Sequence, residues 1–449
     1  MRYFYVDSSF FFSDREHTMT TNHGNWPSSC LVQFKNCTIL RDHKLIQEDL
    51  WIRNCLIVNP EPIFYEERAT ADIQVDCKGA IISPGYIDLQ INGGMGVDFS
   101  HNVDIIGEAV AKVAKGVLPF GVTSICPTIV TSTPDVYHKA LSKVQKCNGS
   151  ANGAGILGLH LEGPFINKHK KGAHKAQLIQ SLDDGLEAVT KTYGPLDNVA
   201  IVTVAPELDV EDTVIPSLVK RGITVSIGHS EANLVQGEKA IQRGASFITH
   251  LFNAMLPFHH RDPGLVGLLT SKKLPEEKHI FYGIIADGIH THPAALRIAY
   301  KTNARGEAGF DSNVQNLENC AGLTLVTDAM SAMGLEAGVH FIGENKVEIV
   351  GKRAVIAGTS TLCGSIATMD FCVRFLQKST GCSTVEALES ASLHPAEVLG
   401  IADQKGTLNF GAEADFVMLS GDLHVTSTWI AGKCVWERSP NEFTYERKK

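Results

Sequence analysis

The sequence predicts an α/β fold: a (β/α)8 barrel of the TIM type, with a small β-sandwich domain formed by both ends of the chain. Through the middle of the chain, eight apolar strand-like runs alternate with helical patterns, which is the order of elements in such a barrel. Shorter alternating segments precede and follow this region, and they indicate antiparallel strands. The 449 residues suffice for one barrel and a small second domain.

The predicted sandwich combines residues 31–83 with residues 405–440. Its first part contains runs such as LVQFKNCTIL and EDLWIRNCLIV, and its second part contains ADFVMLS and HVTSTWIAGKCVW. The preceding residues 1–30 are aromatic but carry internal charges and lack a clean basic start and a small-residue cleavage site, so we do not identify a signal peptide. We expect this N-terminal extension to be disordered or loosely attached.

The predicted catalytic barrel spans residues 84–404. Its strand-like runs lie, in order, at 80–93, 121–130, 155–163, 198–207, 222–229, 245–253, 279–288 and 322–330. Helical patterns such as 103–118 and 383–400 fill the intervals. Residues 303–320 are polar and rich in Gly and Asn, so we expect a surface insertion between the seventh and eighth units.

Composition limits the classes of function. The net charge is −9 and the chain has no long basic run, which argues against nucleic-acid or anionic-membrane partners. The 11 cysteines are dispersed and form no CxxC pair, as expected for reduced thiols in the cytoplasm. No apolar run reaches the roughly 18 residues that a membrane-spanning helix needs. These features predict a cytoplasmic enzyme.

Three strand-like runs end in residues that can bind a metal: Glu162 in the third, His229 in the fifth and His250 in the sixth. Taken singly, each side chain is also compatible with a structural role. Parallel barrel strands bring their carboxyl ends to one face, where active sites lie. Two imidazoles and a carboxylate there form a three-ligand set that leaves one coordination position open. The sequence therefore predicts one divalent metal ion per subunit.

Asp328 ends the eighth run in the same way, and a carboxylate at the end of a buried strand is costly unless it is paired or functional. We predict that it is the catalytic base. The first strand carries Gln90, Ile91 and Asn92, with no His-x-His pair for a second metal, and the fourth ends without a lysine. Gln90 either hydrogen-bonds the water at the metal or simply packs at the barrel mouth.

Several further residues follow strand ends and are candidates for substrate contacts. They include His174 after the third run, Asn253 and Ala254 after the sixth, and Arg261 and His290 in later loops. Each alone is a weak signal. The Gly/Ser/Thr-rich segment 357–365 follows the eighth run, where barrel loops often bind phosphate, although it is also compatible with an ordinary turn.

Taken together, these residues resemble one family. The motifs HLEGPF, GHS, THLFNAM, RDPG, IADGIH, LVTDAM and STLCGSIATMD occur in this order. They are similar to those of the N-acetylglucosamine-6-phosphate deacetylases of the amidohydrolase superfamily, most closely the animal enzymes. The resemblance extends from about residue 31 to residue 437 and leaves out residues 1–30 and 303–320.

The resemblance implies hydrolysis of N-acetylglucosamine 6-phosphate to glucosamine 6-phosphate and acetate, in amino-sugar catabolism. It implies zinc at Glu162, His229 and His250, proton transfer by Asp328, and a homodimer. It assigns His174 to the acetamido carbonyl. The implied substrate contacts are Ala173, His174, Asn253, Ala254, Arg261, Asp287, Gly288, Ile289, His290, Leu362, Cys363 and Gly364.

One departure from the family pattern is Cys363, which stands where small residues such as Ala are usual. Two alternatives remain. A cyclic-amide or dipeptide amidohydrolase would keep the fold, but the missing His-x-His and the presence of Arg261 and His290 argue against it. A catalytically dead sugar-phosphate sensor would not need the base, so the presence of Asp328 beside the metal set argues against that function.

Overall fold

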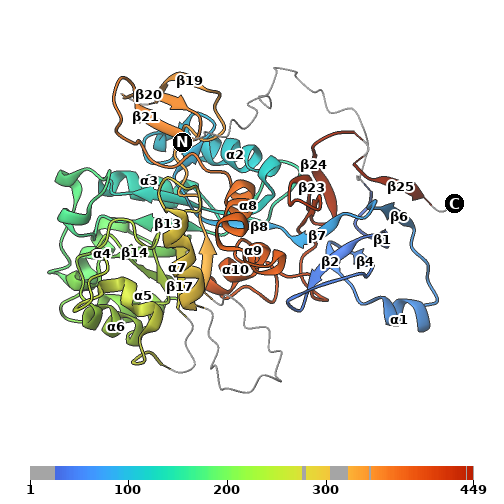
Figure 1. Ribbon diagram of the computed structural model, residues 1–449, viewed down its shortest axis with the longest axis horizontal. Coiled ribbons are helices and arrows are strands. Elements are labelled where there is room, and N and C mark those ends of the chain that lie inside the picture. Colours follow the sequence, from blue (N-terminus) through green and yellow to red (C-terminus); the bar gives the residue numbers. More distant parts are fainter. Residues whose placement is uncertain (1–25, 276–279, 304–321, 343–344, 441, 448–449) are drawn as a thin grey trace.

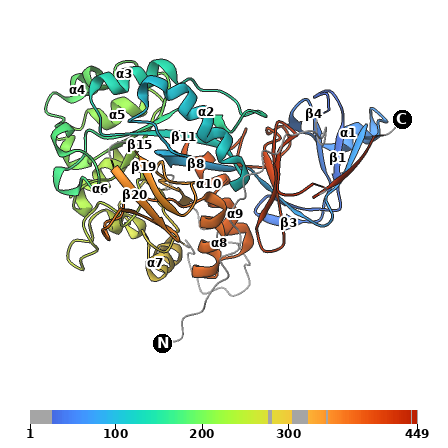
Figure 2. The same ribbon diagram turned by 90° about the horizontal axis from the view of Figure 1, so that it is seen from above.

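The computed structural model describes residues 26–275, 280–303, 322–342, 345–440 and 442–447. The chain forms a barrel surrounded by helices and, beside it, a domain of two sheets (Figure 1, Figure 2). In both views the N-terminal blue strands and the C-terminal red strands lie together in the two-sheet domain. The predicted fold class is therefore confirmed.

The two-sheet domain contains a five-stranded sheet of order β25-β6-β1-β4-β5 and a six-stranded sheet of order β24-β23-β22-β7-β2-β3. The first uses β1 (Val32–Lys35), β4 (Leu50–Arg53), β5 (Leu56–Ile57), β6 (Ile73–Asp76) and β25 (Thr444–Arg447). The second uses β2 (Thr38–Arg41), β3 (Lys44–Ile46), β7 (Ile81–Pro84), β22 (Phe416–Leu419), β23 (Val425–Ile430) and β24 (Lys433–Glu437). A short helix, α1 (Pro60–Tyr65), follows β5.

Aromatic residues from both ends of the chain form the core of this domain. The rings of Phe34 and Phe416 lie 5.0 and 5.4 Å from the ring of Trp429. Trp26 also packs on Trp429, at 6.0 Å, so at least its side chain belongs to the domain and not to a loose extension. At the other end β25 lies beyond the predicted limit at residue 440, because it pairs with β6. The rest of the predicted extension, residues 1–25, lies outside the described residues.

The barrel strands correspond to all eight apolar runs. In order they are β8 (Tyr86–Ile91), β11 (Val122–Val130), β13 (Leu159–Glu162) with β12 (Gly155–Ile156) before it, β14 (Val199–Val204), β15 (Thr224–Ile227), β16 (Phe247–Ile248), β17 (Phe281–Ile284) and β18 (Leu323–Leu325). Each pairs in parallel with the next from β8 to β18. Most are buried on both faces, which explains why they read as continuous apolar runs.

Helices cover the outside of the barrel. They are α2 (Ile106–Gly116), α3 (Pro134–Lys143), α4 (Gly185–Tyr193), α5 (Val214–Val219), α6 (Leu234–Gln242), α7 (Pro293–Asn303), α8 (Met369–Thr380), α9 (Thr384–Glu389) and α10 (Leu393–Val398). In α2 the buried residues recur at helical spacing, from Ile106 through Ala109 and Val110 to Val113 and Ala114. The helical pattern predicted at 383–400 is two helices, α9 and α10.

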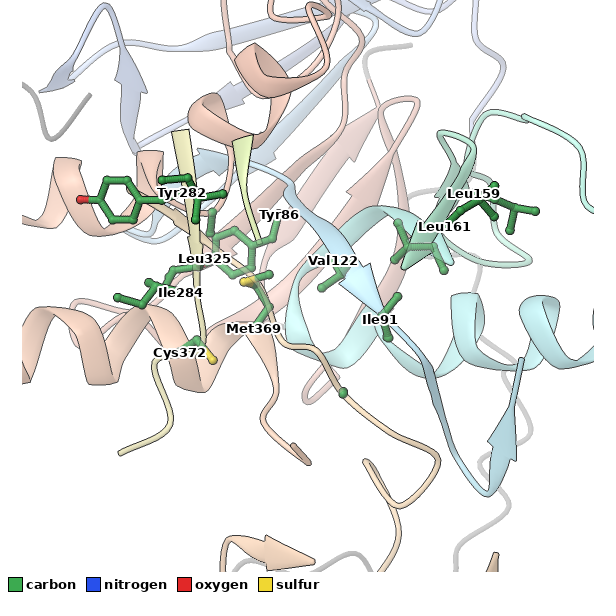
Figure 3. Close-up of a cluster of buried hydrophobic side chains, with 14 of the residues drawn as sticks. Tyr86, Ile91, Val122, Leu159, Leu161, Tyr282, Ile284, Leu325, Met369 and Cys372 are labelled. Atoms are coloured by element: carbon green, nitrogen blue, oxygen red, sulfur yellow. The ribbon is translucent and has the colours of Figure 1, made fainter. Parts of the chain in front are cut away.

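Side chains from the strands and the surrounding helices form one large core (Figure 3). Tyr86, Tyr282 and Leu325 from the strands lie near Met369 and Cys372 of α8, and all five are almost fully buried. This close packing holds the strand ends, and thus the residues that follow them, in fixed positions.

Strands one and eight close the barrel in an unusual way. Among the described residues, no continuous ladder joins β18 to β8; a single bridge pairs Ile91 with Ala329. Lower down, the segment between α9 and α10 lies between the two strands. The backbone N–H of Ile87 donates to Ala391 O and that of Leu325 to Ser390 O, both at 2.8 Å. We refer to this junction as the seam.

Two small β structures, one after strand one and one after strand eight, complete the fold. A small hairpin, β9 (Gly93–Gly94) and β10 (Val97–Asp98), follows strand one. Strand eight is followed by a three-stranded antiparallel sheet of β19 (Gly338–Ile342), β20 (Asn345–Val350) and β21 (Arg353–Ile356), which the sequence analysis did not predict. The predicted insertion at 303–320 falls almost wholly on 304–321, outside the described residues.

Candidate metal centre and active site

Glu162, His229 and His250 meet at the carboxyl end of the barrel. Glu162 ends β13, and the two histidines lie two residues beyond β15 and β16. Glu162 Oε1 is 3.2 Å from Nε2 of His229 and 3.1 Å from Nε2 of His250. The two Nε2 atoms are 3.0 Å apart, and all three side chains are buried. These residues are a group that could hold a metal ion.

The hydrogen bonds around the centre fit a bound cation. Nδ1 of His229 lies 2.7 Å from the carbonyl oxygen of Lys170, so this nitrogen carries the proton and Nε2 presents a lone pair. That lone pair faces a carboxylate oxygen and a second imidazole nitrogen. When Nε2 of His250 is also unprotonated, three electron-rich atoms face one another at these distances, and a cation between them would remove their repulsion. Two nitrogens and one oxygen are also a ligand set that zinc accepts.

Two of the three groups, His229 and Glu162, have pKa values shifted toward the forms that bind a metal. Burial lowers the pKa of His229 to about 4, which keeps the imidazole neutral and able to coordinate. Burial alone would raise the pKa of Glu162, but its contacts with His174, His229 and His250 hold it well below its usual range. For His250, burial acts to lower the pKa, and the hydrogen bond and charge of Glu162 outweigh it and raise the pKa.

Asp328 lies beside this group, three residues beyond β18. It is half-buried, and its Oδ1 accepts hydrogen bonds from Asn92 Nδ2 at 2.6 Å and from Gln90 Nε2 at 3.2 Å. Gln90 Nε2 also donates to Glu162 Oε1 at 2.7 Å. Burial, and then the charge of Glu162, raise the pKa of Asp328 to about 6. A carboxyl group with a pKa near neutrality is suited to accept and return a proton.

His174 completes the centre from the loop after β13. The backbone N–H of Thr131 donates to its Nδ1 at 3.3 Å, so Nδ1 is the acceptor and Nε2 carries the proton in the neutral ring. Nε2 lies 3.6 Å from Glu162 Oε2, and the His174 ring is 4.6 Å from that of His229. An N–H donor is therefore fixed beside the metal ligands.

Besides His174 and its neighbour Ala173, the predicted substrate residues lie in three further loops that follow β17, β16 and β21. In the first, the carboxylate of Asp287 accepts the backbone N–H groups of Ile289 and His290 and contacts Nδ1 of His290 at 2.6 Å. Gly288 between them has φ +75°, which only glycine adopts easily. Burial acts to raise the pKa of Asp287, but its contacts with His290 hold it below its usual value.

The second and third loops are less directly connected to the ligands. Asn253 is half-buried next to Ala254, whose carbonyl accepts from Ser230 N. The segment Leu362–Gly364 runs alongside the residues after Asp328, since Met330 N donates to Ser365 O and a bridge joins Ala329 to Ser365. Ala173 is exposed beside His174. Arg261 is exposed, and the structure gives its guanidinium no hydrogen-bond partner among the described residues.

The sequence analysis missed one residue of the centre and one beside it. Asn92 holds Asp328, and Thr131 holds His174 through its backbone N–H and its hydroxyl group, the latter at 2.7 Å. Asn92 had a detectable signal: it follows Gln90 by two residues, and alternate residues of a strand point the same way. Thr131 had none, because its partner is distant in the sequence.

A chain of buried polar groups lies inside the barrel on the strands that carry the ligands. His160 Nδ1 lies 2.9 Å from the Leu89 carbonyl oxygen and therefore donates to it, so its Nε2 accepts from Thr203 Oγ1 at 2.8 Å. Thr203 Oγ1 is 2.8 Å from Thr249 Oγ1, which is 2.5 Å from Ser226 Oγ. Burial lowers the pKa of His160 to about 4, so the ring stays neutral. The chain links strands three to six.

Comparison with known proteins supports a hydrolase of the amidohydrolase type. Residues 81–435 match the Amidohydrolase family. The chain is 55% identical over 408 residues to N-acetylglucosamine-6-phosphate deacetylase of Bos taurus, covering 91% of this chain and 96% of that protein. It is 32% identical over 412 residues to N-acetylgalactosamine-6-phosphate deacetylase of Escherichia coli O157:H7, covering 88% and 98%.

A solved structure of similar fold supports the same family. A mutant N-acetyl-D-glucosamine-6-phosphate deacetylase from Mycobacterium smegmatis, in complex with N-acetyl-D-glucosamine-6-phosphate, superposes with a TM-score of 0.72 at 30% identity, covering 90% of this chain and 99% of that one. Within the described part of the chain, no helix is long and apolar enough to span a membrane. The family match over most of the chain, the extent of identity and the geometry of the centre agree: the chain belongs to the N-acetylglucosamine-6-phosphate deacetylases of the amidohydrolase family.

Proposed function

We propose that the protein hydrolyses the acetamido group of N-acetylglucosamine 6-phosphate, releasing glucosamine 6-phosphate and acetate in amino-sugar catabolism. The observation that carries the proposal is the meeting of Glu162, His229 and His250 beside Asp328 at the carboxyl end of the barrel. A metal-dependent hydrolase needs both parts: a metal site and a nearby carboxyl group that can accept and return a proton, here one with a pKa of about 6.

Each residue then has a defined task. A divalent cation, zinc in this proposal, would be held by Glu162, His229 and His250, and when bound it would make water more acidic and polarise the amide carbonyl. Asp328 accepts the proton of the attacking water as the new carbon–oxygen bond forms. It then gives this proton to the amine nitrogen as the carbon–nitrogen bond breaks, and acetate leaves.

The negative charge that develops on the carbonyl oxygen also needs a donor from the protein. His174 is suited to this task, because its Nε2 carries the proton and its Nδ1 is fixed by Thr131. A donor that is already oriented stabilises the developing charge without reorganisation in the transition state. Gln90 donates to both Glu162 and Asp328 and so orients the base relative to this metal ligand.

Recognition of the sugar phosphate is assigned to the surrounding loops. In this proposal the sugar phosphate is contacted by His290, which Asp287 holds, by Asn253 with Ala254, and by the segment Leu362–Gly364. The guanidinium of Arg261 offers paired donors suited to a phosphate, and it is exposed with no hydrogen-bond partner among the described residues of its own chain. We therefore propose that the working form is a homodimer in which Arg261 serves the neighbouring subunit's site.

Acetate release is the direct test. Purified protein is assayed with N-acetylglucosamine 6-phosphate before chelation, after chelation and after zinc is restored. We expect release that is lost with the metal and recovered with zinc, and that is weak on N-acetylglucosamine without phosphate. N-acetylgalactosamine 6-phosphate, the epimeric sugar phosphate, is assayed for comparison, because one relative is named as its deacetylase. No release from folded, zinc-loaded protein that still binds the sugar phosphate would identify a sensor, and release from cyclic amides or dipeptides would identify another amidohydrolase.

Cytoplasmic location and the division of the chain remain part of the proposal. The cysteines in the described residues are all free thiols, which suits a reducing compartment. Residues 84–404 would form the catalytic domain, supported by the sandwich of residues 31–83 and 405–440. Fractionation of cells and light scattering of the purified protein test location and dimer formation, respectively.

A further inference from the structure

The seam between strands one and eight places a buried carboxyl group directly beneath the catalytic machinery. Asp88 of β8 is 1% exposed. Its Oδ1 accepts the backbone N–H of Thr327 at 3.2 Å and that of Gln90 at 3.3 Å, and its Oδ2 accepts the hydroxyl group of Thr327. No lysine, arginine or histidine contacts it among the described residues. Its hydrogen bonds thus go to the residue before Asp328 and to Gln90.

The hydrogen bonds of Asp88 connect strands one and eight where a continuous backbone ladder is absent. Strands one and eight lack continuous backbone pairing in the described structure, because residues 390–391 occupy the space between their lower halves. Above that point the strands are joined by Asp328 N donating to Gln90 O at 2.8 Å and Asn92 N donating to Ala329 O at 2.8 Å. The Asp88 carboxyl group bridges the strands just below this pair of bonds.

The backbone at Asp328 needs this support. Its φ of +47° lies in the left-handed region, which aspartate adopts more readily than most residues but which still costs more than it does for glycine. A turn of that kind persists only when its surroundings hold it. Thr327, the residue before it, is held by Asp88 through both its hydroxyl group and its amide.

We propose that Asp88 is a positioning residue for the hydrolytic reaction: through Thr327 it fixes Asp328, and through the backbone of Gln90 it fixes the side chain that joins Asp328 to Glu162. It touches neither substrate nor metal. The inference rests on the proposed deacetylase function, because it needs Asp328 to be the base. Small misplacements of a catalytic group have large effects; about 1 Å can cost about 100-fold in rate.

The test compares three substitutions on strand eight in the full chain loaded with zinc. Thr327→Val removes the hydroxyl group that Asp88 binds and keeps the side-chain shape. Thr327→Ser keeps the hydroxyl group. Thr324→Val is the matched control: Thr324 is fully buried on the same strand, and its hydroxyl group has no partner among the described residues. For each variant, kcat, KM, zinc content and thermal stability are measured.

We expect Thr327→Val to lower kcat by about 10- to 100-fold, with KM and zinc content within about twofold of the parent. Thr327→Ser should keep kcat within about threefold of the parent's value, and Thr324→Val should leave kcat unchanged. If Thr327→Val does not fold, Asp88→Asn, which keeps the shape and one acceptor, takes its place with the same expectation.

Two results would overturn the inference. One is a folded Thr327→Val or Asp88→Asn variant with the parent's kcat. The other is a loss of kcat accompanied by an equal loss of zinc or matched by Thr324→Val, which would indicate a structural role alone. Both are distinct from failure of the proposed function, in which the unmodified protein releases no acetate.

Discussion

Replacement of Asn92 by alanine tests how the base is tuned. Asn92 Nδ2 donates to Asp328 Oδ1 at 2.6 Å, and this bond stabilises the ionised carboxylate. Its loss therefore raises the pKa of Asp328. Because Asp328 acts as a base only when ionised, the acidic limb of kcat/KM moves to higher pH.

The size of this shift follows from the geometry. A hydrogen bond to a charged group contributes roughly 1.5–3 kcal/mol, and about 1.4 kcal/mol corresponds to one pH unit. Gln90 still donates to the same oxygen at 3.2 Å, so the lower end applies. We expect a shift of about one pH unit.

The assay is kcat/KM from about pH 5 to pH 9, expressed per bound metal ion so that metal loss at low pH does not contribute. Asn198→Ala is the matched control, because Asn198 Nδ2 donates to a neutral carbonyl group, that of Leu141, just before β14 at the other end of the barrel. An acidic limb that stays in place in Asn92→Ala, or that moves equally in Asn198→Ala, would refute the reasoning.

Three further outcomes are expected. Asp328→Asn should abolish acetate release while zinc content and sugar-phosphate binding persist; turnover above a few per cent of the parent would contradict its role as the base. Thr203→Val removes the donor to His160 Nε2 and should lower the free energy of unfolding by about 1–3 kcal/mol in urea, whereas unchanged stability would show that the buried polar chain is not needed. Burial raises the pKa of Asp88 to about 7 from its ordinary 3.8, so its favourable contribution is complete below about pH 4 and is lost as the pH rises through 7. The stability of Asp88→Asn relative to the parent should therefore increase by up to about 4 kcal/mol over that range, and a difference independent of pH would contradict this.

The sequence predicted the barrel well because its strands are buried on both sides. Such strands read as apolar runs, and the first polar residue after each run marks the strand end, which is how Glu162, His229 and His250 became visible together. The same argument could not find β19, β20 and β21, since this sheet is buried on one face only and its middle strand, β20, alternates polar and apolar residues.

Contacts between distant residues were beyond prediction from one sequence. Asp88 and Thr327 meet only because the barrel closes on itself, and no local pattern joins them. For the same reason, the hydrogen bonds that select the protonated nitrogen of His229 and of His174 could not be foreseen. Arg261 illustrates the opposite limit, because its motif was recognisable but the folded chain gives its exposed guanidinium no hydrogen-bond partner among the described residues.

The segment at 390–391 that separates strands one and eight also affects how the protein can be made. Ile87 and Leu325 each need a carbonyl group from this segment, so the barrel cannot close when its eighth strand leaves the ribosome. The two-sheet domain has the same requirement, because β7 pairs with β22 from the other end of the chain. Both units are thus completed only by the C-terminal part of the chain, and pairings of such long sequence separation form slowly. A nascent chain therefore exposes its apolar strands until residues 390–391 and β22 have been synthesised. We expect chaperones to bind the growing polypeptide during this time.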